Sequence, residues 1–358
     1  MDKKPLCAEK NGELIFTLFA DMHYKKGMYL PSVQDMEKIL DRAHENNSDF
    51  VIHVGDLCND YLGSPELVNA YLHNRYGLLA CGVYGNHELE TKGNTMAVVT
   101  PLLCSLPEKA VFGTADGRIS PEIGYYYFDI KGFRMICLDT NYSYNEALGV
   151  YEHNKEGSWG SPKENTLQNS LGPQQLSWLE TVLTKSAEEG VSCVLFSHAS
   201  FVEDWEHSPE WETVGTLIKK ANDRKKRTVV MVVNGHYHED ACKVLDNVLY
   251  LNTNVVRNGF WGVSHEQHYL DGQTFLFTDY DKSGRETRTY EKNINELSQA
   301  QNTYFFADPL SAVVKLSPDG GIKIEGAKTK WLYDVKPDAD RMNPFIHPYI
   351  LSGEWQLD

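Results

Sequence analysis

Short apolar runs alternate with stretches of helical spacing along the first 240 residues. The runs span residues 14–20, 50–54, 78–84, 191–197 and 228–233. Each run ends at a polar residue, which is typical of a buried β-strand followed by a loop. Two further runs, residues 125–130 and 133–140, flank Lys131-Gly132, and this arrangement predicts a hairpin.

Three helices are predicted between these strands. Ser32 is a suitable N-cap for a helix whose apolar residues recur every three or four positions. These residues are Val33, Met36, Leu40 and Ala43. Residues 174–186 and 213–221 show the same spacing. Strands that alternate with helices predict an α/β fold in which the strand ends share one edge, where open α/β sheets bind their ligands.

The pattern changes after residue 240. Short β-like pieces follow at residues 242–245, 248–252, 274–278, 312–316 and 322–325, so we expect a β-rich C-terminal extension. We interpret residues 1–327 as one domain with insertions near residues 141–171 and 255–273. The remaining residues, 328–358, are expected to pack on it as an irregular tail.

Composition and charge narrow the function classes. Asp and Glu total 50 against 34 Lys and Arg, a net charge of −16 in 358 residues, which argues against binding long nucleic acids. A small phosphorylated substrate stays compatible, because bound metal ions invert the local sign of charge. The seven cysteines are scattered without a CxxC pair, and no stretch approaches the ~18 apolar residues of a membrane span. We therefore expect a soluble cytoplasmic protein without membrane partners. No pattern indicates its oligomeric state.

The candidate chemistry lies at the ends of the predicted strands. The polar residues there are Asp21, His23, Asp56, Asn86, His87, His198, His236 and His238. Two carboxylates, one amide and five imidazoles without a thiolate suit Mn, Fe, Zn, Co or Mg rather than a cysteine-rich structural zinc site. Seven of these side chains would supply about four ligands to each of two metals if one carboxylate bridges the ions.

The same residues carry a family resemblance. The segments DMH, GDLCN, GNHE, SH and GHYH occur in this order over residues 21–238, about 60 % of the chain. They resemble the five motifs of the calcineurin-like metallophosphoesterases, D-x-H, G-D, G-N-H-E/D, H and G-H-x-H. The resemblance implies a four-layer αββα sandwich with two mixed β-sheets.

The resemblance also implies a role for each motif residue. Asp21, His23 and His238 would hold one divalent metal ion. Asn86, His198 and His236 would hold a second ion. Mn, Fe or Zn is expected at both positions. Asp56 would bridge the two ions. His87 would face the substrate as the catalytic residue without binding metal.

The implied activity is hydrolysis of a phosphate ester by a hydroxide that bridges the two metals. Departures from the motifs argue against two branches of the family. Asn59 stands where the protein phosphatases carry a second Asp, and no Arg follows it. Asn59 and His23 also argue against the purple acid phosphatases, which carry a Tyr and a Gly at these two places. The substrate is expected to be a small phosphomonoester or phosphodiester. Cyclic nucleotides or glycerophosphodiesters are the alternative substrates, and a non-catalytic metal-binding scaffold is the alternative outside enzymes.

The two insertions are expected to select the substrate. Both exceed the ~12–15 residues that a compact domain normally leaves in one loop. Their candidate residues are Tyr142, Tyr144, Tyr151, His153, Trp159, Arg257, Phe260, Trp261 and His265. The alternative is that these side chains only anchor the insertions to the body of the protein.

Overall fold

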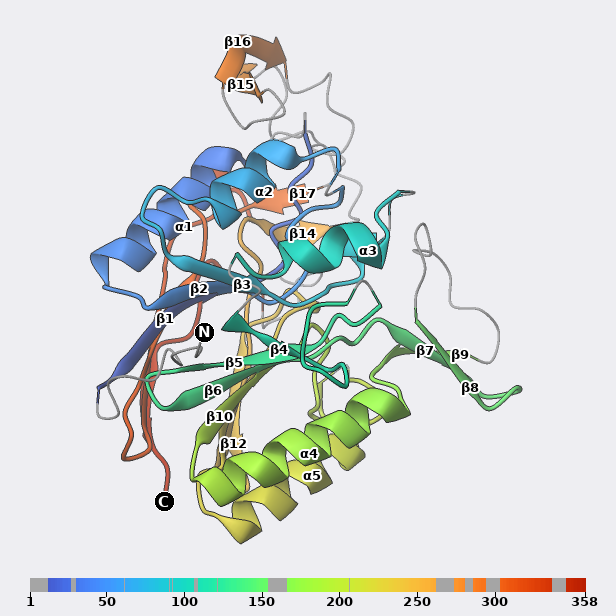
Figure 1. The fold of residues 1–358 in the computed structure, drawn as a ribbon. Helices are drawn as coiled ribbons and strands as arrows, with labels where there is room; N and C mark the ends of the chain where they lie inside the picture. Colours follow the sequence, from blue (N-terminus) through green and yellow to red (C-terminus); the bar gives the residue numbers. More distant parts are fainter. Residues whose placement is uncertain are drawn as a thin grey trace, which may run out of the picture.

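The structure is a computed structural model. It describes residues 12–26, 30–60, 62–89, 91, 93–105, 109–120, 122–153, 166–205, 207–261, 274–280, 286–293, 303–336 and 346–358. Two large mixed β-sheets face each other in these residues, and helices cover the outer face of each (Figure 1). The fold is therefore the expected four-layer α/β sandwich.

The first sheet combines the start and the end of the chain. Its order is β20 (Gly353–Gln356), β19 (Gly321–Gly326), β18 (Ala312–Leu316), β1 (Leu14–Phe19), β2 (Phe50–His53) and β3 (Leu79–Gly82). The strands β1, β2 and β3 run parallel, and β18 pairs antiparallel with β1. The β-rich C-terminal extension thus completes the sheet that the N-terminal strands begin.

The second sheet has seven strands. Its order is β12 (Ala241–Leu245), β13 (Val248–Asn252), β11 (Val229–Asn234), β10 (Ser192–Phe196), β6 (Phe133–Cys137), β5 (Tyr126–Ile130) and β4 (Val111–Phe112). Strands β6, β10, β11 and β13 are parallel, and β5 and β6 form the predicted hairpin. The carboxyl ends of β6, β10 and β11 therefore meet at one edge.

Four helices provide the outer layers (Figure 1). α1 (Val33–Glu45) and α2 (Pro65–Leu72) cover the first sheet, and α4 (Pro173–Glu189) and α5 (Trp211–Arg224) cover the second. The predicted cap of α1 is confirmed, because Ser32 and Asp35 form a reciprocal capping box. One core fills the space between the sheets, and a smaller one lies between the second sheet and its helices.

Shorter elements lie outside the two sheets. They are α3 (Met96–Val99), a pair of strands β14 (Asn258–Trp261) and β17 (Thr303–Phe305), and the hairpin β15 (Thr274–Tyr280) with β16 (Glu286–Asn293). The 3-10 turns His87–Leu89, Thr100–Leu102 and Leu332–Asp334 also lie outside the two sheets.

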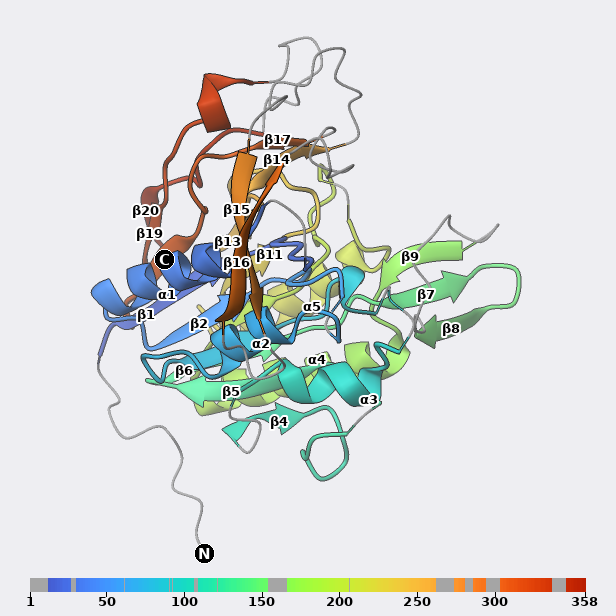
Figure 2. The same cartoon turned by 90° about the horizontal axis from the view of Figure 1, so that it is seen from above.

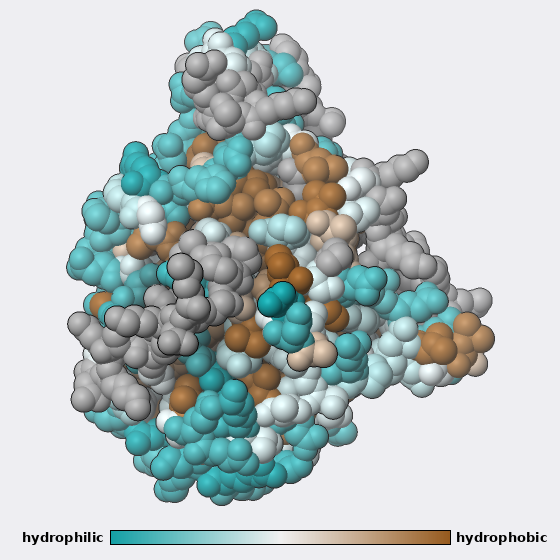
Figure 3. Space-filling model, in the orientation of Figure 1, coloured by the Kyte–Doolittle hydropathy of each residue, from teal (hydrophilic) through white to brown (hydrophobic). Residues whose placement is uncertain are grey.

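The first expected insertion forms a sheet of its own. Within residues 141–171, β7 (Tyr142–Asn145) pairs with β8 (Val150–His153) and β9 (Thr166–Ser170). Figures 1 and 2 both show this sheet projecting from the body, and we call it the arm. Its outer end exposes Leu148, Val150 and Leu167, and the space-filling view shows this apolar tip (Figure 3). Trp159 lies outside the described residues.

Two other segments differ from the sequence expectations. Val255 and Val256 are fully buried, and Arg257 pairs with the Asp35 carboxylate at 2.6 Å, so residues 255–257 belong to the body of the protein. The rest of that insertion, residues 262–273 with His265, lies outside the described residues, and the side chains of Phe260 and Trp261 are not described. The tail is irregular over only part of residues 328–358, because β20 adds an edge strand to the first sheet.

Candidate metal centre

The predicted site residues come together where the two sheets meet. Backbone hydrogen bonds join the loops that follow the strands: the N–H groups of Asp21 and His23 donate to Gly55 and Asp56 at 3.1 and 2.8 Å. On the second sheet, Gly235 donates to the carbonyl of His198 at 3.1 Å. The N–H of His236 donates to Asp21 Oδ2 at 2.9 Å and joins the two sheets, and we call the carboxyl ends of β1, β2, β10 and β11 together the platform.

Five residues of this platform adopt a left-handed backbone conformation. Their φ angles lie between 50° and 76°, and the residues are Asp21, His23, Asp56, His236 and His238. L-residues adopt this conformation rarely, and such strain gathers at functional sites where the surrounding structure holds it in place. These turns lie directly after the strands, where they place the side chains of the candidate site.

Asp21, His23 and His238 form one group of potential ligands. Their ligand atoms lie within 4.8 Å of one another, with the Nε2 atoms of His23 and His238 3.0 Å apart. His238 Nε2 is 3.5 Å from Asp21 Oδ1. This group can hold one metal ion.

Asp56, His198 and His236 form a second group. His198 Nε2 lies 3.2 Å from Asp56 Oδ2 and 3.1 Å from His236 Nδ1. Asp56 Oδ2 also lies 3.7 Å from His23 Nε2 in the first group. One carboxylate oxygen therefore stands between the two groups, which is the position that a bridging ligand needs.

Two buried oxygens indicate that the site is built for cations. Asp21 Oδ1 and Asn86 Oδ1 have no hydrogen-bond partner within the described part of the chain. Such orphaned acceptors are rare in protein interiors, because an unpaired buried oxygen costs about 1–3 kcal/mol. A divalent ion would satisfy both oxygens, so the residues present fit a two-metal centre.

Hydrogen bonds on the far side of two imidazoles fix their orientation. His23 Nδ1–H donates to Asn59 Oδ1 at 2.9 Å, and His198 Nδ1–H donates to the Val54 carbonyl at 2.8 Å. Because both acceptors are oxygens, each ring keeps the lone pair of Nε2 for the site. Asn59, which departs from the protein-phosphatase motif, thus orients a candidate ligand.

Burial and charge perturb the titration of the group around Asp56. Burial raises the pKa of Asp56, but His198 and His87 outweigh it and hold this pKa well below its usual range. Burial lowers the pKa of His198, yet the Asp56 carboxylate outweighs it and raises this pKa to about 10. Burial and then His198 lower the pKa of His236 to about 3. A metal ion competes with the proton for the imidazole of His198, so metal binding should depend on pH.

His87 lies beside both groups. Its Nε2 is 3.9 Å from Asp56 Oδ2, and its ring meets the His23 ring edge-on at 4.7 Å between centroids. The ligand atoms of His23, Asp56 and His87 also lie within 4.8 Å of one another. The geometry thus brings His87 to the centre of the site, and its role as catalytic residue rather than ligand stays a prediction.

Glu88 is a functional residue that the motif contains but that sequence analysis did not single out. Its carboxylate accepts the backbone N–H groups of Asp56 at 2.9 Å, Leu57 at 2.7 Å and Gly85. Burial and then Asp56 raise the pKa of Glu88 to about 7. This side chain ties the loop after β2 to the loop after β3. The signal in the sequence was its place in GNHE, directly after two predicted site residues.

Several histidines outside the motifs have other partners. His44 stacks on Tyr76, and His207 Nδ1–H donates to the Trp205 carbonyl. His53 is fully buried against the rings of Phe19 and Tyr71, and His347 pairs with Asp240 at 3.0 Å. His153 pairs with Asp139 at 2.8 Å.

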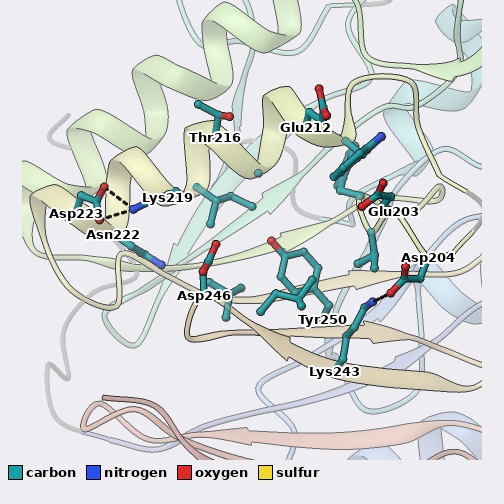
Figure 4. A pocket seen from close by; sticks show the side chains of 17 residues that line it. Glu203, Asp204, Glu212, Thr216, Lys219, Asn222, Asp223, Lys243, Asp246 and Tyr250 are labelled. Atoms are coloured by element: carbon teal, nitrogen blue, oxygen red, sulfur yellow. Dashed lines mark hydrogen bonds and ion pairs between the residues drawn. The ribbon is translucent and has the colours of Figure 1, made fainter.

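A cavity of about 710 Å³ lies elsewhere, between α5 and the strands β12 and β13 (Figure 4). Its apolar floor includes Ile218 and Tyr250, and its rim carries the ion pairs Lys219–Asp223 and Lys243–Asp204. None of the predicted site residues lines it. The cavity is therefore separate from the metal centre.

Comparisons with known proteins agree with this fold and site. The model of the calcineurin-like phosphoesterases matches residues 14–240. A dimetal phosphatase from Danio rerio aligns with 87 % of this chain and 95 % of its own at 15 % identity and a TM-score of 0.54. No curated protein matches the sequence.

Two further solved structures are more distant. GAP50, the anchor in the inner membrane complex of Plasmodium, aligns with 97 % of this chain and 89 % of its own at 12 % identity and a TM-score of 0.45. A 5'-nucleotidase from Candida albicans aligns with 70 % of this chain and 46 % of its own at 15 % identity and a TM-score of 0.41.

Fold and site together define a metal-dependent phosphoester hydrolase. The chain belongs to the calcineurin-like phosphoesterase family. No helix among the described residues has both the length and the apolarity that crossing a bilayer requires.

Proposed function

We propose that the chain hydrolyses small phosphomonoesters or phosphodiesters at a two-metal centre around Asp56. The observation that carries the proposal is the position of Asp56 Oδ2, which lies 3.2 Å from His198 Nε2 in one group and 3.7 Å from His23 Nε2 in the other. A carboxylate oxygen between two sets of imidazoles is the arrangement that two cations sharing one ligand require. We therefore place the phosphoryl group of the substrate over Asp56.

The ligand assignment follows the two groups. Asp21, His23 and His238 would hold one ion, Asn86, His198 and His236 the other, and Asp56 both. These nitrogen and oxygen donors suit Mn, Fe or Zn. When bound, two such ions supply an activated water and neutralise charge on the phosphoryl oxygens.

The remaining chemistry falls to His87. Its imidazole is 8 % exposed and reaches the centre of the site, so it can donate a hydrogen bond or a proton to the leaving oxygen. The backbone N–H of His87 donates to Asp56 Oδ1 at 2.9 Å. This bond couples the position of the proposed acid to that of the bridging carboxylate.

The test is a parallel assay of 4-nitrophenyl phosphate and its bis-ester with the full chain loaded with Mn, Fe or Zn. We expect hydrolysis of at least one ester, and the ratio of the two rates distinguishes a monoesterase from a diesterase. Substrates of the alternative class, cyclic nucleotides and glycerophosphodiesters, are then tested directly. If the metal-loaded protein hydrolyses none of these esters, the proposal is refuted. The alternative, a non-catalytic metal-binding scaffold, would then be favoured.

His87→Ala provides the mechanistic control. The variant should keep its metals and lose roughly 10²–10⁴-fold in turnover, with a smaller loss for esters of good leaving groups. The control is His44→Ala. His44 lies on α1, where its ring stacks on Tyr76, so this variant should keep both metals and its turnover. A His87→Ala protein that has lost its metals would instead make His87 a ligand.

A further inference from the structure

A second histidine–carboxylate pair lies at the same edge of the second sheet. His153, the last residue of β8 in the arm, places Nε2 2.8 Å from Asp139 Oδ2. Asp139 follows β6 by two residues and is fully buried. Because a carboxylate only accepts, His153 donates this hydrogen bond.

The carboxylate of this pair is held rigidly. Gln175 Oε1 accepts the backbone N–H of Asp139 at 2.8 Å, and Gln175 Nε2 donates to the Asp139 carbonyl at 2.7 Å. The second carboxylate oxygen accepts the backbone N–H of Asn141 at 2.9 Å. The imidazole of His153 is therefore set on a fixed support that belongs to the body of the protein.

Strand register places this support beside the metal centre. In the parallel pair β6–β10, Cys137 is level with Phe196, and the N–H of Leu138 donates to the Phe196 carbonyl at 2.8 Å, so Asp139 follows β6 at the edge where His198 follows β10. A side chain at Gly124 would meet both Asp139 Oδ2 and the Tyr84 ring, so the Asp139 carboxylate lies close to the segment after β3 of the opposite sheet. The N–H of Ala199 donates to Thr140 Oγ1 at 3.3 Å, which holds the two loops together.

The opposite sheet confirms the location. The His153 ring meets the Tyr84 ring edge-on at 6.3 Å between centroids, and Tyr84 precedes the candidate ligand Asn86 by two residues. Tyr142 meets His153 edge-on at 4.6 Å. His153 thus lies between the segments that carry Asn86 and His198, with two tyrosine rings around it.

A buried hydroxyl nearby lacks a partner. Tyr125 is fully buried, and its hydroxyl forms no hydrogen bond within the described residues. Burial and then the charge of Asp139 raise the pKa of Tyr125 to about 12. Two aromatic rings, an imidazole and a hydroxyl without a partner among the described residues are groups that suit an organic ring with a hydrogen-bonding edge.

We propose that His153, supported by Asp139, contacts the organic group of the substrate and selects esters of ring-bearing alcohols. The inference rests on the proposed function, which places the phosphoryl group at Asp56. Neighbouring strands are ~4.8 Å apart, so the loop that carries Asp139 follows the strand next to the one that precedes His198. The His153 ring, held by Asp139 at 2.8 Å, is therefore within reach of the organic group attached to phosphorus. Two other candidate residues of the arm have different neighbours: Tyr144 packs against Tyr151 at 4.6 Å between ring centroids, and burial and then the nearby charge of Glu210 raise the pKa of Tyr151.

The competing explanation is that His153 only anchors the arm, and a matched set of variants separates the two. His153→Ala removes the ring and the anchor, whereas His153→Gln keeps a donor for Asp139 without the ring. Tyr151→Phe removes another polar group of the arm, the Tyr151 hydroxyl near Glu210, and leaves the Asp139–His153 pair intact. Each full-length variant is loaded with metal, and its metal content is measured.

The probes are 4-nitrophenyl phosphate, which carries a ring, and inorganic phosphate, which has no organic group. We expect both His153 variants to raise the KM for 4-nitrophenyl phosphate about tenfold, the effect of one lost hydrogen bond or ring contact. The inhibition constant of inorganic phosphate and the metal content should stay within about twofold of the wild type. Tyr151→Phe should change neither constant.

Three outcomes would overturn the inference: an unchanged KM, an equal rise in both constants, or an equal effect of Tyr151→Phe. A wild-type KM in His153→Gln would also overturn the inference, because a hydrogen-bond donor to Asp139 would then account for the role of His153 without its ring. Failure of the proposed function is separable from these outcomes. If the metal-loaded wild type hydrolyses neither 4-nitrophenyl phosphate nor its bis-ester, the proposed function fails. The binding of 4-nitrophenyl phosphate and of inorganic phosphate, measured by calorimetry, then still compares the variants.

Discussion

The carboxylate of Glu88 accepts the backbone N–H of Asp56 at 2.9 Å, so the proposed bridging ligand is held by a residue from the neighbouring strand's loop. The same carboxylate also accepts the N–H of Leu57 at 2.7 Å and that of Gly85. These three bonds fix the left-handed turn at Asp56, whose φ is 53°. The geometry of the metal centre therefore depends on a side chain that does not itself point at the metals.

The variant Glu88→Gln should bind metal more weakly than the wild type. The amide nitrogen of the introduced side chain would direct its own hydrogens at one or two backbone N–H groups, which costs about 1–3 kcal/mol of stability. Outer-sphere changes of this kind typically lower metal affinity about 10–100-fold. Titration calorimetry with Mn or Zn measures the affinity.

Glu66→Gln is the matched control for this change. Glu66 is also buried, but among the described residues its Oε1 accepts the Tyr24 hydroxyl, at 2.7 Å, and no other donor. An amide oxygen can accept the same hydrogen bond. This variant should bind metal as the wild type does. If Glu88→Gln binds metal with the affinity of the wild type, the left-handed turn at Asp56 does not depend on the Glu88 carboxylate.

Asp56→Asn should lose metal as well as activity. An amide has no negative charge to share between two cations, and its nitrogen cannot bind either of them. Elemental analysis should find about two ions per chain in the wild type and clearly fewer in the variant. Asp116→Asn, a change at an exposed carboxylate, is the control and should keep both ions. If Asp56→Asn binds two ions per chain with wild-type affinity, Asp56 is not a bridging ligand.

His53→Leu should make the protein less sensitive to acid. Both ring nitrogens of His53 are buried without a hydrogen-bond partner among the described residues, and burial lowers its pKa to about 3. The folded pKa is below that of the unfolded chain, so the unfolded state binds more protons below about pH 6.5. The free energy of unfolding is therefore unaffected by His53 above this pH. It falls as the pH decreases from 6.5 toward 3, because protons bind to His53 in the unfolded state and not in the folded state.

The effect of His53 can be measured as a difference between two pH values. Between pH 6.5 and pH 5 the wild type should lose about 2 kcal/mol through this residue, and His53→Leu should not. Urea unfolding at both pH values gives the two free energies. His73→Leu, a change at an exposed histidine on the end of α2, should leave the wild-type pH dependence unaltered.

Arg257→Met should destabilise the fold rather than alter substrate preference. Arg257 and Asp35 form a buried ion pair at 2.6 Å between the segment after β13 and the start of α1. Removing one partner leaves a buried charge and costs about 3–5 kcal/mol. Thermal unfolding should show the loss.

The double variant Arg257→Met with Asp35→Asn distinguishes this explanation from a substrate contact. Asparagine removes the uncompensated charge and can still accept the N–H of Ser32, so the double variant should recover part of the lost stability. A change in KM with unaltered stability in Arg257→Met would restore the expectation that Arg257 lines the substrate wall.

The sequence by itself determined the features that depend on neighbouring residues. Alternating apolar runs and helical spacing predicted β1, β2, β3, α1, α4, β10, α5 and β11, because each pattern is local in the chain. Ser32 was recognisable as a cap for the same reason. The order of the metal-ligand motifs identified the family and the metal-binding chemistry, since ligand type and spacing lie in the sequence itself.

Only the tertiary structure decided which distant segments meet. β18 pairs with β1 across almost 300 residues, and no local pattern encodes that partnership. Arg257 looked like a loop residue because its partner Asp35 is more than 200 residues away. Glu88 and the Asp139–His153 pair were likewise hidden, because their roles arise when parallel strands bring their carboxyl ends to one edge and fix side chains that the sequence keeps apart.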